Sequence, residues 1–328
     1  MTNMKKLGLS ALAGSLVAFS ANAAELSVAG GVELTYVDTG GNKGNEITGN
    51  SYGANSSITM TGSGDVGFGT VSMTRTINDS ANGWGSSFQS LDMGDMGILS
   101  FDSSAGGLVG VTANDDLLPT AYEEVSTGVS SKGVSGLGST NVIGYRNSFG
   151  MVSISAGYSQ LGAQTAESAG SGEASHGSAS DIYVSVSPID GLTVGAGTSE
   201  NTSTDISATS TDTKEIVGQA VYSAGPVSFG YRQGESNKGK AGTASRTVEH
   251  YSIAFNVNDN FAVSYGQQDT EVEAISATAA VTEEVTGISA AYTMGAASVR
   301  LNHSTSDNDN GVAGVDDETT ELSLVLSF

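Results

Sequence analysis

Side chains that could catalyse a reaction are few in this 328-residue sequence, and their spacing fits no catalytic or metal site. His176, His250 and His303 are the only histidines, and no two of them are four residues apart, a spacing typical of metal ligands. The absence of Cys excludes thiolate metal sites and disulfides. His250 and Ser252 would share the polar face of a strand, but no G-x-S-x-G motif accompanies them. We therefore predict that the protein is not an enzyme and has no metal site.

Two glycine-rich stretches match phosphate-binding motifs only in part. Residues 62–67 have the form G-x-G-x-x-G, but β-branched strand residues follow where a helix N-terminus would have to meet the phosphate. Residues 234–240 resemble a P-loop, but Ala241 stands where Ser or Thr would bind magnesium. We interpret the first stretch as a hairpin turn and the second as a chance match in a long loop. No cofactor and no nucleic-acid partner are predicted.

A third candidate is the acidic stretch of residues 307–318, which has the residue types of a calcium loop. The fifth-position ligand and the final Glu spacing of an EF-hand are both missing. A solvated hairpin loop is the favoured interpretation, and weak divalent-cation binding stays open as an alternative.

The charged side chains best placed to act on a passing solute lie in residues 102–138. Beyond Asp102 at its start, this segment contains a cluster of four acids, Asp115, Asp116, Glu123 and Glu124. It also contains apolar residues that a solvated loop would not need, namely Leu108, Val109, Val111, Leu117, Leu118 and Val125. Such residues can pack on a wall while the acids face a channel. The alternative is that the acids form a solvated loop face.

The elements around this segment are β-strands with a two-residue period. The last strand shows the period most clearly, with Leu322, Leu324, Leu326 and Phe328 on one parity and mostly polar residues on the other. A soluble sheet would leave this apolar strand as an exposed edge, whereas in a barrel the last strand pairs with the first. Alternation of this kind recurs along the chain and predicts about sixteen strands, an even number in the range of membrane barrels.

The connections between the expected strands alternate strictly in length. Short turns are expected at 62–66, 93–97, 147–150, 187–191, 224–226, 257–260 and 294–296. Long polar segments are expected at 38–50, 77–87, 102–138, 160–179, 199–213, 233–245, 268–283 and 304–317. Aromatic residues on the apolar parity precede several short turns, namely Tyr145, Tyr222, Phe255 and Tyr292. Two rims of different loop length and an aromatic girdle on one side are typical of outer-membrane barrels.

The N-terminus predicts export. Residues 1–23 have the basic, apolar and small-residue regions of a signal peptide, which ends at Ala21-Asn22-Ala23. Its removal takes away two lysines and no acid, so the formal charge changes from −23 to −25. No later segment is apolar enough for a membrane helix, so any membrane span must be a closed barrel. We expect residues 24–328 to form one all-β domain, a transmembrane antiparallel barrel.

Together, the signal peptide, the alternating connections, the Phe-terminated strand and the long segment after the fifth strand resemble the trimeric general porins of Gram-negative outer membranes. The alphaproteobacterial branch is the most similar. The resemblance covers the whole mature chain by pattern, without one decisive short motif. It implies a water-filled channel for ions and small hydrophilic solutes and a homotrimer that assembles through the early strands. It also implies partners in the outer membrane: lipid, lipopolysaccharide and the barrel assembly machinery, which would read the terminal residues Leu322, Leu324, Leu326 and Phe328.

The resemblance further implies an inward-folded acidic loop after the fifth strand, set against basic side chains on the opposite wall. Residues 102–138 match the position of that loop, and the channel should therefore prefer cations. Candidates for the basic wall are Arg146, Arg232, Arg246 and Arg300, which have the polar parity. Arg75 shares the parity of Val71 and Met73 and would reach the lumen only through a bulge.

Two alternatives remain at this stage. A substrate-specific channel would show a ladder of aromatic residues on the polar parity, which has few. A surface structural protein, such as a β-solenoid adhesin, would show a fixed short repeat, which is absent.

Overall fold

The computed structural model describes residues 25–79, 83–104, 109–114, 117–129, 133–137, 141–161, 177–203, 212–238, 244–273 and 281–328. The predicted signal peptide lies outside the described residues, and so do Leu108, Asp115, Asp116, His176 and Ala241, which were singled out above. Within the described ranges, no helix has the length and apolar character that crossing a membrane requires.

The described chain is almost entirely β-strand. The strands are β1 (Glu25–Gly41), β2 (Tyr52–Asp65), β3 (Thr70–Asn78), β4 (Trp84–Asp92), β5 (Ile98–Ser104), β6 (Val142–Phe149), β7 (Val152–Leu161), β8 (Gly177–Ile189), β9 (Leu192–Ser203), β10 (Thr213–Ala224), β11 (Val227–Lys238), β12 (Arg246–Asn258), β13 (Phe261–Val272), β14 (Val281–Met294), β15 (Ala297–Asp307) and β16 (Asp317–Ser327). Two short 3-10 turns, η1 (Gly94–Met96) and η2 (Asp309–Gly311), interrupt them.

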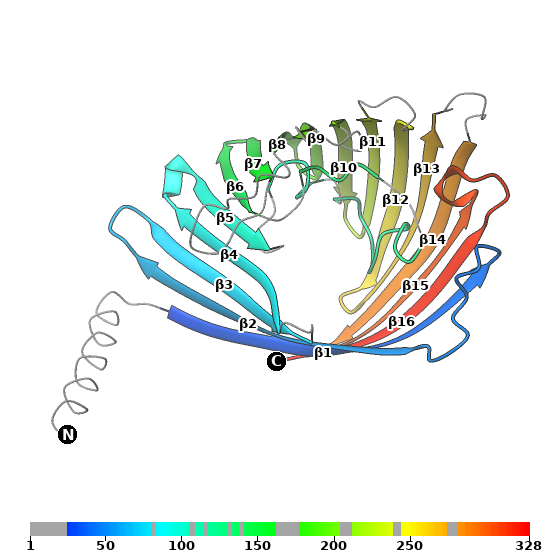
Figure 1. Ribbon diagram of the computed structural model, residues 1–328. Coiled ribbons are helices and arrows are strands. Elements are labelled where there is room, and N and C mark those ends of the chain that lie inside the picture. Colours follow the sequence, from blue (N-terminus) through cyan, green and yellow to red (C-terminus); the bar gives the residue numbers. More distant parts are fainter. Residues whose placement is uncertain are drawn as a thin grey trace, which may run out of the picture.

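Each strand pairs antiparallel with its neighbours in sequence, and β1 also pairs with β16, which closes a sixteen-stranded barrel. Figure 1 shows β1 beside β16 at this seam. In the seam register Leu34 lies opposite Leu324 and Tyr36 opposite Leu322. The predicted all-β antiparallel barrel is confirmed.

The two parities of the strands face different surroundings. On β16, Leu322 and Leu326 are each 47% exposed, whereas the intervening Ser323 is fully buried. Along the other strands, large apolar side chains are likewise exposed on one parity, and buried polar side chains such as Gln268 and Asn302 lie on the other. In a closed barrel only one face can hold an apolar band exposed all round, so the apolar parity faces outward and the polar parity inward.

The C-terminal residue closes the ladder. The backbone N–H of Phe328 donates to the carbonyl of Gly30 at 2.9 Å, and the N–H of Gly30 donates back to Phe328 at 2.9 Å. A Cβ on Gly30 would lie only 2.7 Å from the Phe328 ring, so the ring covers a backbone position that has no side chain. Glycine covered by an aromatic residue of the neighbouring strand is a known way to stabilise a sheet at such a position.

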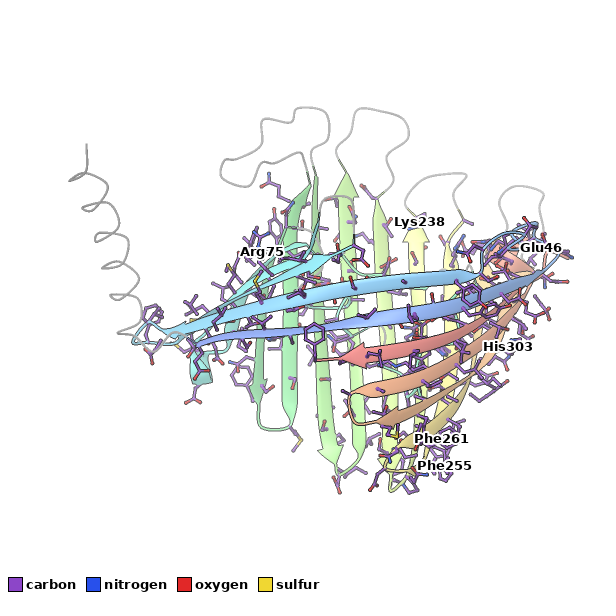
Figure 2. The ribbon with its side chains drawn as sticks, turned by 90° about the horizontal axis from the view of Figure 1, so that it is seen from below. Glu46, Arg75, Lys238, Phe255, Phe261 and His303 are labelled. Carbon is purple, nitrogen blue, oxygen red and sulfur yellow. The ribbon has the colours of Figure 1, made fainter. Side chains whose placement is uncertain are left out.

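The two rims of the barrel differ as the sequence predicts. Figure 2 shows Phe255 and Phe261 together at the end of the short turns, far from Lys238 at the long connections. Two predictions need correction. Residues 234–238, expected in a long loop, lie at the end of β11. Gly62 and Gly64 lie inside β2, and the turn is at 66–69, where Val66 N–H donates to the Gly69 carbonyl at 2.9 Å. The ladder of Gly62 and Gly64 with Met73 and Val71 keeps both residues in the sheet.

Candidate functional site

The connection between β5 and β6 makes its contacts on the inward-facing parity of the barrel wall. Its apolar residues are buried in three clusters with wall residues. Val109 and Leu137 pack with Val142 and Ala179; Val111 and Val134 pack with Tyr183 and Val217; and Val125 and Val129 pack with Val285. Leu118 is also buried, while Leu117 is 46% exposed. Burial of these side chains is what holds the connection against the wall.

Hydrogen bonds from the backbone of the connection complete its attachment. Gly110 N–H donates to Ser155 Oγ on β7 at 2.7 Å, and Gly136 N–H donates to Glu215 Oε2 on β10 at 2.9 Å. On the far side, Ala121 N–H donates to Ser264 Oγ on β13 at 2.9 Å. The described parts of the connection therefore follow the inner face of the wall from β7 to β13, and Figure 1 shows them inside the barrel.

Small residues on the wall leave room for the connection. A Cβ on Gly230 would meet Pro119 Cδ at 2.4 Å, and a Cβ on Gly234 would meet Val134 Cγ2 at 2.5 Å. Real side chains do not approach so closely, so glycine is required at both positions for the backbone of β11 to accept the connection. Some of the high glycine content of the chain thus serves this contact.

Three glutamates meet where β1 pairs with β16. Tyr122 of the connection donates its hydroxyl to Glu321 Oε1 at 2.8 Å and to Glu33 Oε1 at 3.4 Å. Burial, followed by the negative charges of Glu321 and Glu33, raises the pKa of the neighbouring Glu123 above its ordinary value of 4.5. Ser323 makes a short hydrogen bond to Glu33. We call Glu33, Glu123 and Glu321 the seam glutamates.

Of the four acids predicted from the sequence, Glu123 and Glu124 are among the described residues. Glu123 belongs to the seam glutamates, and Glu124 follows it in the same half-buried stretch. Sequence reasoning missed Glu33 and Glu321. Their signal was present, because each is an acid on the inward parity of a strand whose other parity is apolar, and closure of the barrel places those two strands side by side.

The predicted arginines have the inward parity on β6, β11, β12 and β15 but differ in surroundings. Arg232 is only 5% exposed, and its Nη2 lies 3.5 Å from His250 Nδ1 and 3.4 Å from Gln268 Oε1. Arg300 lies over the ring of Tyr122, 5.1 Å from its centre. Arg246 is half-buried near the outer end of β12. Arg146 lines a cavity of about 650 Å³ together with Asn114 and Ser155.

Arg75 does not join this set. It pairs with Met60 of β2 in a regular register, so it keeps the outward parity of Met73. The register shift between β3 and β4 occurs between Arg75 and Ile77 and does not carry Arg75 to the inner face. The hypothesis that a bulge brings Arg75 into the lumen is therefore not retained.

The inward face of β2 to β4 carries hydroxyl groups that pair across neighbouring strands. Pairs of hydroxyls bridge neighbouring strands: Thr59 with Thr76 at 2.9 Å, Thr61 with Thr74 at 3.2 Å, and Ser72 with Ser90 at 2.7 Å. Among the described residues of strands β1 to β5, Arg75 is the one basic residue, and it faces outward. The arginines instead lie on strands that the β5–β6 connection contacts or adjoins.

The remaining candidates from the sequence, His250, Ser252 and His303, lie on strands of the barrel wall. His250 and Ser252 share the inward parity, and His250 is 1% exposed beneath the connection. His303 lies on the outward parity and its Nδ1 is 2.8 Å from Thr320 Oγ1. No group of three or more His, Cys, Asp or Glu residues in the described part of the chain is arranged to hold a metal ion.

Comparison with known protein families gives one match. A family described as Gram-negative porin matches residues 8–328. No curated protein shows significant sequence similarity to this chain.

Solved structures with the same fold have low sequence identity. OmpF of Salmonella typhi, in complex with daunomycin, has a TM-score of 0.68 and 14% identity over 92% of this chain and 97% of that chain. A porin refined at 1.8 Å resolution has a TM-score of 0.65 and 15% identity over 93% and 100% of the two chains. OmpT of Vibrio cholerae in its trimer form has a TM-score of 0.65 and 14% identity over 93% and 99%.

Proposed function

Because the chain belongs to the Gram-negative porin family and forms an outer-membrane barrel, we propose that it is a diffusion channel that prefers cations. Ions and small hydrophilic solutes cross it passively through a water-filled lumen, and no reaction is catalysed. Residues 1–23 are removed on export, and residues 24–328 form the barrel. Residues 102–138 narrow the lumen and set its charge.

The observation that carries this proposal is the path of the β5–β6 connection. Its buried valines and its backbone hydrogen bonds reach from β7 and β10 to β13, and Tyr122 reaches the seam between β1 and β16. A segment attached at so many points reduces the open cross-section of the barrel. It also brings Glu123 to Glu33 and Glu321, so that three acids lie at the narrowed part.

The balance of charge at this place favours cations. The inward faces of β2 and β3, which follow β1 next to the seam, carry paired hydroxyls and no inward-facing basic residue. Of the inward arginines, Arg232 is buried and Arg300 lies over the ring of Tyr122. Arg146 and Arg246 lie on β6 and β12, several strands away from the seam. Fixed charges in a narrow opening with low-dielectric walls act more strongly on ions than charges spread over a surface.

Replacing all three seam glutamates by glutamine tests the proposal. Glutamine keeps the size and an oxygen acceptor but removes the charge, so the cation preference should fall strongly while the barrel still assembles. The measurement is the reversal potential across a planar bilayer in a salt gradient. Glu235→Gln is the matched control, because Glu235 has the outward parity on β11 and is exposed. A triple variant with the reversal potential of the wild type would refute the assignment.

We further propose a homotrimer that assembles through the outer faces of β1 to β5. Arg75 supports this proposal, because a basic residue on the outward face costs free energy where that face meets lipid, up to roughly 2–4 kcal/mol at the membrane midplane. A protein neighbour would cover this face and keep it out of contact with lipid. Expected partners at the membrane are lipopolysaccharide at the outer rim and the assembly machinery that inserts the barrel.

A further inference from the structure

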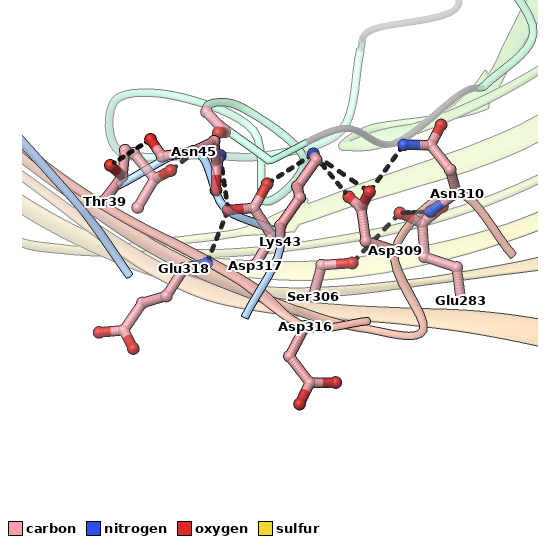
Figure 3. Close-up of polar contacts among 12 residues, drawn as sticks. Thr39, Lys43, Asn45, Glu283, Ser306, Asp309, Asn310, Asp316, Asp317 and Glu318 are labelled. Atoms are coloured by element: carbon pink, nitrogen blue, oxygen red, sulfur yellow. Dashed lines mark hydrogen bonds and ion pairs between the residues drawn. The ribbon is translucent and has the colours of Figure 1, made fainter. Parts of the chain in front are cut away.

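Two connections far apart in sequence meet at the rim that carries the long connections. Lys43 follows β1, and its Nζ lies 2.8 Å from Asp317 Oδ2 and 3.1 Å from Asp309 Oδ2. The side chains of Asp309 and Asp317 are only 3% and 1% exposed, whereas that of Lys43 is 25% exposed. Figure 3 shows the ammonium group between the two carboxylates.

Amide groups add further hydrogen bonds to the two carboxylates. Asn45 Nδ2 donates to Asp317 Oδ1 at 3.1 Å, and Asn310 Nδ2 donates at 2.7 Å to Asp309 Oδ2, which Lys43 also contacts. Burial by itself would lower the pKa of Lys43, but hydrogen bonds and the charges of Asp317 and Asp309 outweigh it and raise the pKa. Lys43 is therefore fully charged at neutral pH.

A second group of hydrogen bonds ties the same two connections together. Asn42 Nδ2 donates to the Gly314 carbonyl at 3.0 Å, and Asn42 Oδ1 accepts from Asp316 N–H at 2.9 Å. Asn42 N–H also donates to the Asp316 carbonyl at 3.0 Å. The first and last long connections of the chain are thus joined directly, next to the seam at which the barrel closes.

We propose that Lys43 acts as the built-in cation of the acidic stretch 307–318 and clasps the first connection to the last. The residue types of this stretch suggest a calcium loop, but the position between its two buried carboxylates is filled by an ammonium group of the same chain. We call the contact of Lys43 with Asp309 and Asp317 the clasp. It closes the outer rim at the seam without a metal ion.

The clasp also bears on the channel, because it lies on the strand that holds the β5–β6 connection. Three successive inward residues of β16 have these roles: Asp317 binds Lys43, Thr319 Oγ1 donates to the Gly128 carbonyl at 2.8 Å, and Glu321 accepts from Tyr122. Loss of the clasp frees the outer end of β16 and loosens the attachment next to it. This consequence for conduction rests on the proposed function, whereas the effect on stability does not.

Thermal unfolding of the detergent-solubilised protein tests the clasp. Lys43→Met leaves two buried carboxylates without their cation and should lower the unfolding midpoint by roughly 5 °C or more. The triple variant K43M/D309N/D317N removes the unpaired charges and should regain most of the loss. Lys214→Met is the matched control, because Lys214 and Glu200 form a pair at 3.0 Å that is 68% and 46% exposed. It should leave the midpoint unchanged, as surface pairs contribute little.

The wild-type midpoint should be the same in EDTA and in excess calcium, since the ammonium group needs no metal. A Lys43→Met midpoint equal to that of Lys214→Met would overturn the proposal, and so would a wild-type midpoint that falls in EDTA. In planar bilayers, Lys43→Met should show more frequent closures than the wild type. If the wild type conducts no ions, the proposed function fails, while the clasp still stands on the unfolding data.

Discussion

Glu123 has a protonation state that its neighbours control. It lies in the β5–β6 connection near Glu321 and Glu33, and burial together with their charges raises its pKa above 4.5. A carboxyl group with a raised pKa takes up its proton at a higher pH than an ordinary glutamate. Glu123 therefore loses its negative charge at a higher pH than an ordinary glutamate does.

On acidification, the cation preference should therefore begin to fall at a higher pH than it would if all the glutamates of the lumen had ordinary pKa values. As the pH falls from 7 towards 4.5, Glu123 becomes neutral, the lumen loses fixed negative charge, and the reversal potential in a salt gradient should move towards zero. Glu123→Gln should remove this part of the pH dependence. A variant whose pH profile coincides with that of the wild type would show that Glu123 does not titrate in the conducting path.

Gly234 offers a steric test of the contact between connection and wall. In Gly234→Val the new side chain would meet Val134, whose Cγ2 lies 2.5 Å from the position of the Cβ. We expect the connection to be displaced away from the wall and into the lumen, so that single-channel conductance falls. Gly218→Val on the neighbouring strand is the control, because no atom lies within 4 Å of its Cβ position. Equal conductance of the two variants would contradict the proposed constriction.

At the level of elements, the two-residue period predicts the strands and their faces well, since most outward positions that face lipid are apolar. The period does not predict which residues of neighbouring strands lie close together. The closeness of Glu33 to Glu321 depends on the seam register, and parity gives the face of a residue but not its height in the wall. The sequence predicts the turn after β2 a few residues too early. Glycine is common in turns, and nothing in the local pattern shows that Gly62 and Gly64 continue the strand.

The register of β16 can be tested by a charge on each face. Leu324 faces outward opposite Leu34 of β1 and Val299 of β15, so Leu324→Arg should destabilise the barrel by roughly 2–4 kcal/mol. Ser323 is a poor comparison, because the structure buries it fully beside Glu33. Thr61→Arg on the inward face of β2 is the better control and should be nearly neutral. Equal urea-unfolding midpoints would mean that the register is wrong by one residue.

For the whole molecule, the sequence predicts the strongly acidic character, with a formal charge of −23, but not its placement. The structure places three acids together at the seam and hydroxyls on the inward faces of β2 and β3. The grouping of the acids depends on contacts between segments about 90 to 290 residues apart, and no local sequence pattern predicts such contacts. It strengthens the expectation of cation preference.

The most direct test of this account is the zero-current potential of the wild-type protein in a planar bilayer that separates two KCl concentrations. Fixed negative charge at a narrowed lumen predicts conducting channels whose potential has the sign of selective K⁺ permeation and shrinks as the salt concentration rises on both sides. A potential of zero, or one with the sign of selective Cl⁻ permeation, would contradict the account.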